Sequence, residues 1–130
     1  MSEILDSRQK TLDMLHNYKE LKIWQKSMEL AKAVLFLAKE FPEEYKYSLT
    51  SQMTRSSISI PTNIAEGSAR TTNKDFSRFL DLAQGSACEL ETQLILSSEI
   101  EIIDQDKFIE LKENINEIQK MIRGFKQNLN

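Results

Sequence analysis

Hydrophobic residues along most of the chain recur at the three- and four-residue spacing of α-helices, and this pattern predicts four helical segments. The clearest segment starts near Asp104, where seven apolar side chains keep an unbroken alternation of three and four residues: Phe108, Leu111, Ile115, Ile118, Ile122, Phe125 and Leu129. Such a stripe is typical of the seam by which a helix packs in a bundle. A similar stripe after Asn73, the expected N-cap, predicts another helix: Phe76, Phe79, Leu80, Ala83, Ala87, Leu90 and Leu94.

The segment 19–40 carries two apolar stripes instead of one. The first comprises Leu21, Trp24, Met28, Ala31, Leu35 and Ala38, and the second Ile23, Leu30, Val34, Leu37 and Phe41. Together they cover about 200° of the helix circumference, roughly twice what a helix on the outside of a monomeric bundle needs. We therefore expect a second subunit to bury one face, through four residues of the second stripe: Ile23, Leu30, Val34 and Leu37.

A fourth helix is predicted over residues 45–66, although it contains a proline. Pro61 has no N–H and should clash with the carbonyl of Ser57. The apolar spacing continues to Ile64, so the pattern predicts a kink in the helix at Pro61 and not a break. Gly67 is expected to end this helix in the left-handed conformation.

The four segments predict an all-α fold: an antiparallel up-down-up-down four-helix bundle over residues 17–130, because connections of a few residues join antiparallel neighbours. Only three Gly and two Pro occur among the 130 residues, which favours helices over turn-rich β folds. Residues 1–16 show no sustained period, and we expect them to form a flexible N-terminal tail.

Candidate catalytic chemistry is scarce. His16 is the only histidine, so a di-iron site with two inward-facing histidines is excluded. Cys88 is the only cysteine; it excludes a disulfide within the chain and is expected to be a small packed residue. We therefore predict no enzyme activity, metal, cofactor or small-molecule substrate. No apolar run approaches the ~18 residues of a membrane span, and we expect a cytoplasmic protein that does not bind membranes.

Charge is unevenly distributed along the chain. The net charge of −3 does not favour nucleic acid overall. Residues 46–80, however, hold five basic and two acidic side chains, whereas residues 81–113 hold two basic and nine acidic ones. This polarity fits either head-to-tail contacts between subunits or an ordinary solvated surface. The candidate phosphate-binding residues are Arg55, Arg70, Lys74 and Arg78.

A polar motif lies between Arg55 and Arg70. Asn63 and Glu66 are one turn apart and follow Pro61, with Gly67 next. Two interpretations remain open. The pair can be structural, satisfying backbone groups freed by Pro61 or capping the turn after Gly67. Alternatively, the pair belongs to a polar patch that meets RNA or a protein partner.

At this motif the sequence resembles the four-helix bundle proteins of 23S ribosomal RNA intervening sequences. The resemblance covers about residues 18–103. It is carried by residues 21–26 (LKIWQK), 49–56 (LTSQMTRS) and 59–67 (SIPTNIAEG), followed by Phe76, Phe79-Leu80 and Gly85-Ser86. It implies a left-handed antiparallel bundle that assembles as a homopentamer. The chain is also similar to the accessory variability proteins of diversity-generating retroelements, which partner a reverse transcriptase and bind nucleic acid. No catalytic residue is implied.

Two functions follow as expectations. The first is a non-enzymatic oligomeric bundle that acts as an RNA- or reverse-transcriptase-associated accessory protein. The alternative is a protein–protein adaptor without nucleic-acid binding, in which the acidic region 81–113 docks a basic partner.

Overall fold

The computed structural model describes residues 17–129 and contains four long helices. These are α2 (Lys22–Ala38), α3 (Ser51–Ser68), α4 (Asn73–Glu99) and α5 (Gln105–Leu129). Shorter turns accompany them: η1 (Tyr18–Glu20), η2 (Glu43–Tyr45) and the π-helical turn η3 (Lys46–Thr50), which leads directly into α3. The tail predicted for residues 1–16 lies outside the described residues.

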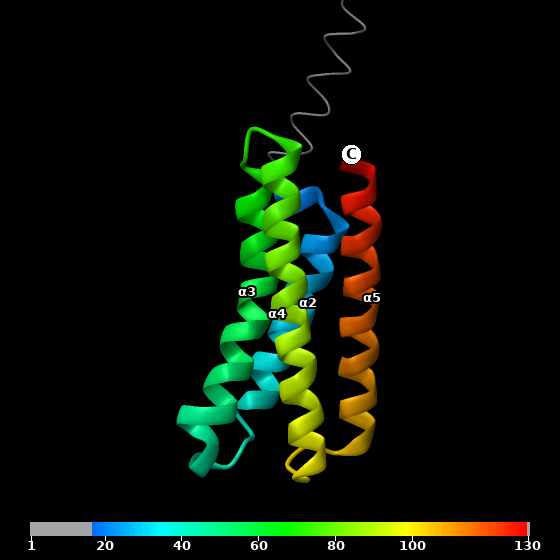
Figure 1. Cartoon of the computed structure of the whole chain (residues 1–130). Coiled ribbons are helices and arrows are strands. Elements are labelled where there is room, and N and C mark those ends of the chain that lie inside the picture. The colour runs from blue at the N-terminus through cyan, green and yellow to red at the C-terminus, as the bar shows by residue number, and fades with distance from the viewer. Residues whose placement is uncertain (1–16, 130) are drawn as a thin grey trace, which may run out of the picture.

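The helices alternate in direction and close into a ring (Figure 1). Each helix packs against the next one along the chain, and α5 also packs against α2. The α3–α4 connection and the end of α5 lie at one end of the bundle, here called the upper end. The α2–α3 and α4–α5 connections lie at the opposite, lower end. The predicted all-α, antiparallel up-down-up-down bundle is confirmed.

The core contains the stripes that the sequence pattern predicts for α4 and α5. Leu80, Leu90 and Leu94 of α4 are fully buried, as are Ile115 and Ile122 of α5. At the upper end, the rings of Phe76 and Phe125 close the core with their centroids 5.3 Å apart. Burying each such aliphatic side chain contributes about 1.5–3 kcal/mol, so these stripes dominate the stability of the bundle.

Small polar side chains line the contact between α3 and α4. Six serines are buried in the described residues: Ser27, Ser56, Ser57, Ser68, Ser86 and Ser97. Three side-chain hydrogen bonds join α3 and α4. The Ser56 hydroxyl donates to Gln93 Oε1 at 2.7 Å, the Ser86 hydroxyl to that of Ser59 at 2.8 Å, and the Ser97 hydroxyl to Met53 Sδ at 3.4 Å. Because buried hydroxyls are costly without partners, these bonds help fix the register of the two helices.

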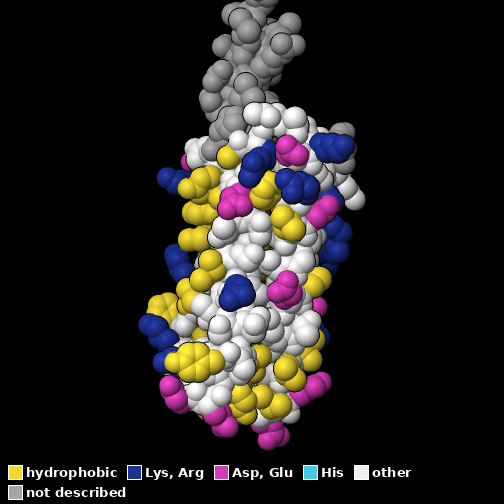
Figure 2. Space-filling view, turned by 60° about the vertical axis from the view of Figure 1, so that its left-hand side comes forward, with side chains coloured by type: hydrophobic (Ala, Val, Ile, Leu, Met, Phe, Trp, Pro, Cys, Tyr) yellow, Lys and Arg dark blue, Asp and Glu magenta, His cyan; other side chains and the backbone are white. Residues whose placement is uncertain are grey.

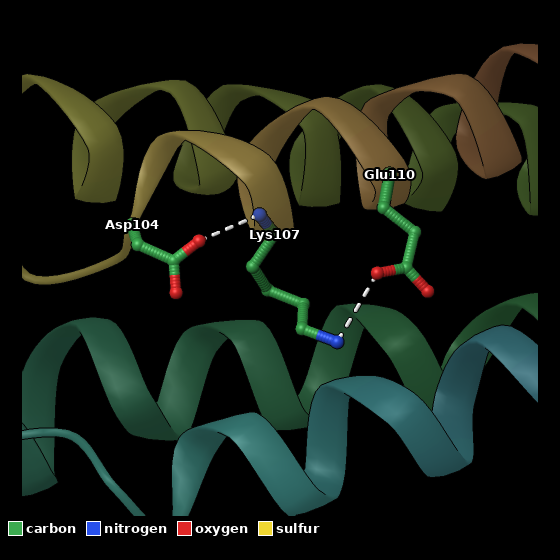
Figure 3. A network of polar contacts seen from close by, with 3 residues as sticks. All are labelled: Asp104, Lys107 and Glu110. Carbon is green, nitrogen blue, oxygen red and sulfur yellow. Dashed lines mark hydrogen bonds and ion pairs between the residues drawn. The ribbon is translucent and has the colours of Figure 1, made fainter.

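Two helix starts depend on side-chain caps. The Thr72 hydroxyl accepts the backbone N–H of Asp75 at 3.1 Å and caps α4, so the predicted cap at Asn73 is wrong by one residue. Asn73 instead donates to the carbonyl of Leu129. At the start of α5, Asp104 Oδ1 accepts the backbone N–H of Lys107 at 2.8 Å (Figure 3). The predicted start near Asp104 is therefore confirmed, and its carboxylate satisfies a helix N–H that would otherwise lack a partner.

The end of α4 has a left-handed residue that is not glycine. Glu101 has a φ of 63°, and its N–H donates to the carbonyl of Ser98 while Ile102 N–H donates to that of Ser97. This pair of bonds is the Schellman arrangement, in which glycine is usually found at the left-handed position. The Cβ of Glu101 is therefore unfavourable in this conformation.

We expect Glu101→Gly to raise the free energy of unfolding by about 0.5–1 kcal/mol, because glycine adopts the left-handed conformation without a steric penalty. Urea-induced unfolding followed by circular dichroism measures the change. Glu89→Gly is the matched control: Glu89 is exposed inside α4, so glycine there should lower stability by about 1 kcal/mol. Equal effects of the two variants would contradict the argument.

Candidate interaction surfaces

Two arginines share one aromatic ring at the upper end of the bundle. The guanidinium carbon of Arg70, in the α3–α4 connection, lies 4.4 Å from the centroid of the Phe79 ring. That of Arg78, in α4, lies 5.0 Å from the same centroid. Phe79 itself is buried with 7% exposure, so the ring is held firmly while both guanidinium groups reach solvent. Stacking on a fixed ring orients both cations before any ligand binds.

These two arginines lack a carboxylate partner within the described chain. The ion pairs there join other side chains: Lys26–Glu117, Lys46–Glu43, Lys107–Glu110 and Lys126–Asp81. Lys74 is exposed in the first turn of α4, between Arg70 and Arg78 in sequence. The upper end therefore has three cationic side chains available to an anionic ligand.

Arg55 does not belong to this group. It is exposed on α3, 13 residues before the helix ends at Ser68, which corresponds to about 20 Å along the helix axis. Figure 2 shows several Lys and Arg side chains near the upper end and Asp and Glu side chains along the lower margin. The structure thus brings together three of the four predicted phosphate-binding residues and separates the fourth.

Within the polar motif around Pro61, the side chain of Asn63 bonds to its own helix and that of Glu66 makes no such bond among the described residues. Pro61 is buried and α3 continues through it as a helix; the predicted kink stays a prediction. Asn63 donates to the carbonyl and the hydroxyl of Ser59, both at 2.9 Å, and not to the Ser57 carbonyl that Pro61 leaves without its usual donor. Glu66 is exposed. Asn63 therefore bonds to a residue two positions beyond the carbonyl that Pro61 frees.

Gly67 is buried inside α3 and is not a left-handed cap. No glycine in the described chain has positive φ, and α3 ends at Ser68 with Ala69 as a right-handed C-cap. A Cβ placed on Gly67 would lie 2.7 Å from Phe79 Cβ and 2.9 Å from Phe76 Cδ1. The prediction of a left-handed glycine is wrong, because the residue is needed for the close approach of α4 to α3.

The α2 residues predicted to face a second subunit lie at the core of the bundle. Ile23, Leu30 and Val34 are 4%, 2% and 1% exposed and belong to the core, and Leu37 packs against that core. They are buried by the same chain and cannot form a free face for a second subunit. The other stripe is mixed: Trp24, Met28 and Leu35 are partly exposed, whereas Leu21, Ala31 and Ala38 are buried.

Trp24, Met28 and Leu35 line an apolar groove along the outer side of α2 and α3, here called the α2–α3 groove. Two adjoining hollows of ≈ 390 and ≈ 520 Å³ share Lys32 and Leu35 as lining residues. Exposed hydrophobic side chains stand beside and within it, with Phe36 67% and Ile58 44% exposed. Figure 2 shows hydrophobic side chains along the left-hand edge of the bundle, interrupted by Lys and Arg side chains.

A second apolar groove lies at the lower end between α3 and α4. It has a volume of ≈ 480 Å³ and is lined by Tyr45, Ser48, Leu49, Gln52, Gln93, Leu96 and Ile100. No feature of the sequence pattern singled it out, because Leu96 and Ile100 fall off the core stripe of α4.

Other candidate chemistry is limited. Residues 17–129 contain no group of three or more His, Cys, Asp or Glu side chains able to hold a metal ion. Cys88 is exposed on α4, so its predicted burial is wrong. No helix in the described range has the length and apolar character needed to span a membrane.

Comparison with known proteins places the chain in a family. The sequence model of the 23S rRNA-intervening sequence protein family matches residues 19–124. The chain belongs to this family. No curated protein matches it. A solved structure from Bacteroides thetaiotaomicron, described as a protein of unknown function from the S23 ribosomal protein family, is similar with a TM-score of 0.76 and 28% identity. The alignment covers 80% of this chain and 97% of that one.

Membership in the 23S rRNA-intervening sequence protein family confirms the resemblance inferred from the sequence. The matched region includes the polar motif, Phe79 and all of α2, α3 and α4. Neither the family nor the solved relative indicates an enzymatic activity. The sequence analysis named Arg70 and Arg78 as candidate phosphate-binding residues but did not connect them with Phe79, on whose ring both stack. The adjacency of Arg78 and Phe79 in the sequence was the one available signal of this contact.

Proposed function

We propose that this protein is a non-catalytic, self-associating bundle that acts as an accessory protein for RNA or a reverse transcriptase. The observation that carries the proposal is the α2–α3 groove, an apolar surface that a second copy would cover. Its lining runs from Tyr18 near the upper end to Thr50 near the lower end. The part of α2 between Trp24 and Lys39 alone spans about 22 Å.

The exposed side chains of the groove supply the driving force for association. Phe36 and Ile58 are large hydrophobic residues left in solvent, and removing apolar surface from water contributes about 25 cal/mol per Å². Lys32 and Lys39 line the groove and can pack their aliphatic chains against a partner while keeping their charges in water. As the family resemblance implies, we propose that the copies form a homopentamer.

The first test is the mass of the assembly by light scattering on a size-exclusion column. We expect the wild-type protein to elute at about five times the 15.1 kDa of one chain. Phe36→Glu combined with Ile58→Glu should shift it to the monomer, because two buried unpaired carboxylates oppose association. Leu82→Glu is the matched control, since Leu82 is 48% exposed on α4 and lines neither hollow of the groove.

A monomeric wild-type protein would overturn self-association. An unchanged mass in the Phe36→Glu/Ile58→Glu variant would instead show that the copies meet elsewhere. Far-UV circular dichroism checks that both variants keep the helical content of the wild type, so that a lower mass is not caused by unfolding.

The RNA part of the proposal rests on Arg70 and Arg78, whose guanidinium groups are oriented on one ring and unpaired within the described residues. Guanidinium groups bind phosphate oxygens through two parallel hydrogen bonds. Lys74 adds a third positive charge. Filter binding of a structured RNA at several salt concentrations tests this part, because each phosphate contact adds to the salt dependence.

The alternative function is a protein–protein adaptor without nucleic-acid binding. It shares the oligomer with the first proposal, but its upper end binds no nucleic acid and the acidic region 81–113 docks a basic partner. An oligomer that retains no RNA at about 0.15 M salt would favour the adaptor.

A further inference from the structure

The apolar groove at the lower end, between α3 and α4, is separate from both surfaces used above. Tyr45 and Leu49 border it on the α3 side, and Leu96 and Ile100 on the α4 side. None of these residues lines the α2–α3 groove. Leu96 and Ile100 are 48% and 41% exposed, so the groove offers apolar side chains to solvent at the surface of α4.

Acidic residues are direct sequence neighbours of two residues that line this groove. Glu44 directly precedes Tyr45, and Glu99 and Glu101 flank Ile100; all three are exposed. None of the three makes an ion pair among residues 17–129. Lys46 is the nearest base in sequence, and it pairs with Glu43. Figure 2 shows hydrophobic side chains at the lower end of the bundle with Asp and Glu side chains around them.

The backbone on both sides of the groove departs from regular helix. On one side, Leu49 lines the groove from the π-helical turn η3. On the other, α4 ends after Glu99 in the left-handed Glu101. Such departures cost free energy and are concentrated at functional sites. Gln52 and Gln93 add amide groups between the apolar residues, which can bond a peptide side chain or backbone.

We propose that this lower-end groove docks a short, positively charged amphipathic helix of a partner protein. Apolar residues on one face of such a helix would fill the groove between Leu49, Leu96 and Ile100, and Lys or Arg residues beside them would face Glu44, Glu99 and Glu101. This is the helix-in-groove mode of recognition, with charge complementarity selecting the partner.

Two other segments of the same chain, the upper end of a second copy and residues 1–16, fit this groove less well. The basic upper end of a second copy has the right charge, but its aromatic residue Phe79 is 7% exposed and presents no apolar anchor. Residues 1–16 contain three acidic and two basic side chains, so they do not complement an acidic rim. A cationic helix with large apolar residues satisfies both requirements.

The test uses a fluorescein-labelled Leu/Lys amphipathic helix of about 14 residues as the probe, which is about four turns. Fluorescence anisotropy with the full-length protein measures its affinity. A peptide of the same composition, scrambled to remove the apolar face, should bind at least about tenfold more weakly. A Leu/Glu peptide with the same pattern should not bind, because its charge is opposite to the one required.

Two pairs of variants assign the binding to the groove. Leu96→Gln/Ile100→Gln removes the apolar anchor without changing charge, and Glu99→Gln/Glu101→Gln removes the rim charges. Each should weaken binding of the Leu/Lys peptide by about tenfold or more. Leu82→Gln, an equally exposed leucine of the same helix, is the control and should leave binding unchanged.

Unchanged binding in the Leu96→Gln/Ile100→Gln variant would overturn the proposal, as would equal binding of the scrambled peptide. A lower assembly mass in that variant, without peptide binding to the wild type, would show that a second copy occupies the groove and would also overturn it. An unchanged assembly mass in the Phe36→Glu/Ile58→Glu variant would not affect the peptide-binding result, because the peptide experiment probes a different surface.

Discussion

Gly67→Ala is expected to destabilise the bundle by about 2 kcal/mol. The new methyl group would lie 2.7 Å from Phe79 Cβ, a distance that side-chain carbons do not adopt, and 2.9 Å from the Phe76 ring. The ring can rotate, but Phe79 Cβ is bonded directly to the backbone of α4. The whole of α4 must therefore move away from α3, and overpacking of this kind typically costs about 1–3 kcal/mol. Alanine's better helix propensity offsets only part of this cost.

The other two glycines are matched controls for the same substitution. Gly85 and Gly124 also lie inside helices, and a Cβ at either meets nothing within 4 Å. We expect Gly85→Ala and Gly124→Ala to raise the free energy of unfolding by up to about 1 kcal/mol each. Urea-induced unfolding at one fixed protein concentration measures all three, since an oligomer's stability depends on concentration. A gain in stability for Gly67→Ala would contradict the packing argument.

Gly67 also shows what a sequence pattern can and cannot predict about this fold. The spacing of α4 and α5 predicted their core residues because each has one narrow apolar stripe, which leaves a single way to face the core. Glycine after an apolar helix is typical of a left-handed cap. Only the position of Phe79 on the neighbouring helix reveals that Gly67 serves close packing, and no local pattern contains that information.

The stripes of α2 illustrate a second limit. The width of the apolar arc correctly indicated that α2 has more hydrophobic surface than a single core contact uses, and Trp24, Met28 and Leu35 are indeed only partly buried. Periodicity does not determine which of two stripes faces inward, because that depends on where α3 and α5 pack. The sequence analysis assigned Ile23, Leu30 and Val34 to the outside, and the structure buries them.

Charge patterns were informative only where the helix connections could be anticipated. Arg70, Lys74 and Arg78 are close in sequence around one turn, so their common location followed from the short α3–α4 connection. Arg55 is linked to them in sequence by the helix α3, whose length separates them in space. The stacking of both arginines on Phe79 depends on side-chain geometry and could not be predicted from spacing.

Arg70→Ala/Arg78→Ala is expected to weaken the binding of a structured RNA by about two orders of magnitude. Each guanidinium lost removes a charge-assisted contact with phosphate, which at about 1.4 kcal/mol corresponds to roughly tenfold in affinity. The dependence of the affinity on salt should also fall, by about one phosphate contact for each arginine. Filter binding at four or more salt concentrations gives both the affinity and the slope.

Two further variants separate charge from orientation. Arg55→Ala also removes one positive charge but lies about 20 Å along α3 from the upper end, so it should change affinity by less than about threefold. Arg70→Lys/Arg78→Lys keeps both charges and loses the planar groups that stack on Phe79. It should weaken binding by about tenfold while the salt slope stays close to that of the wild type. If Arg55→Ala weakens binding as much as Arg70→Ala/Arg78→Ala, the RNA contacts the bundle through general charge and not through the oriented pair.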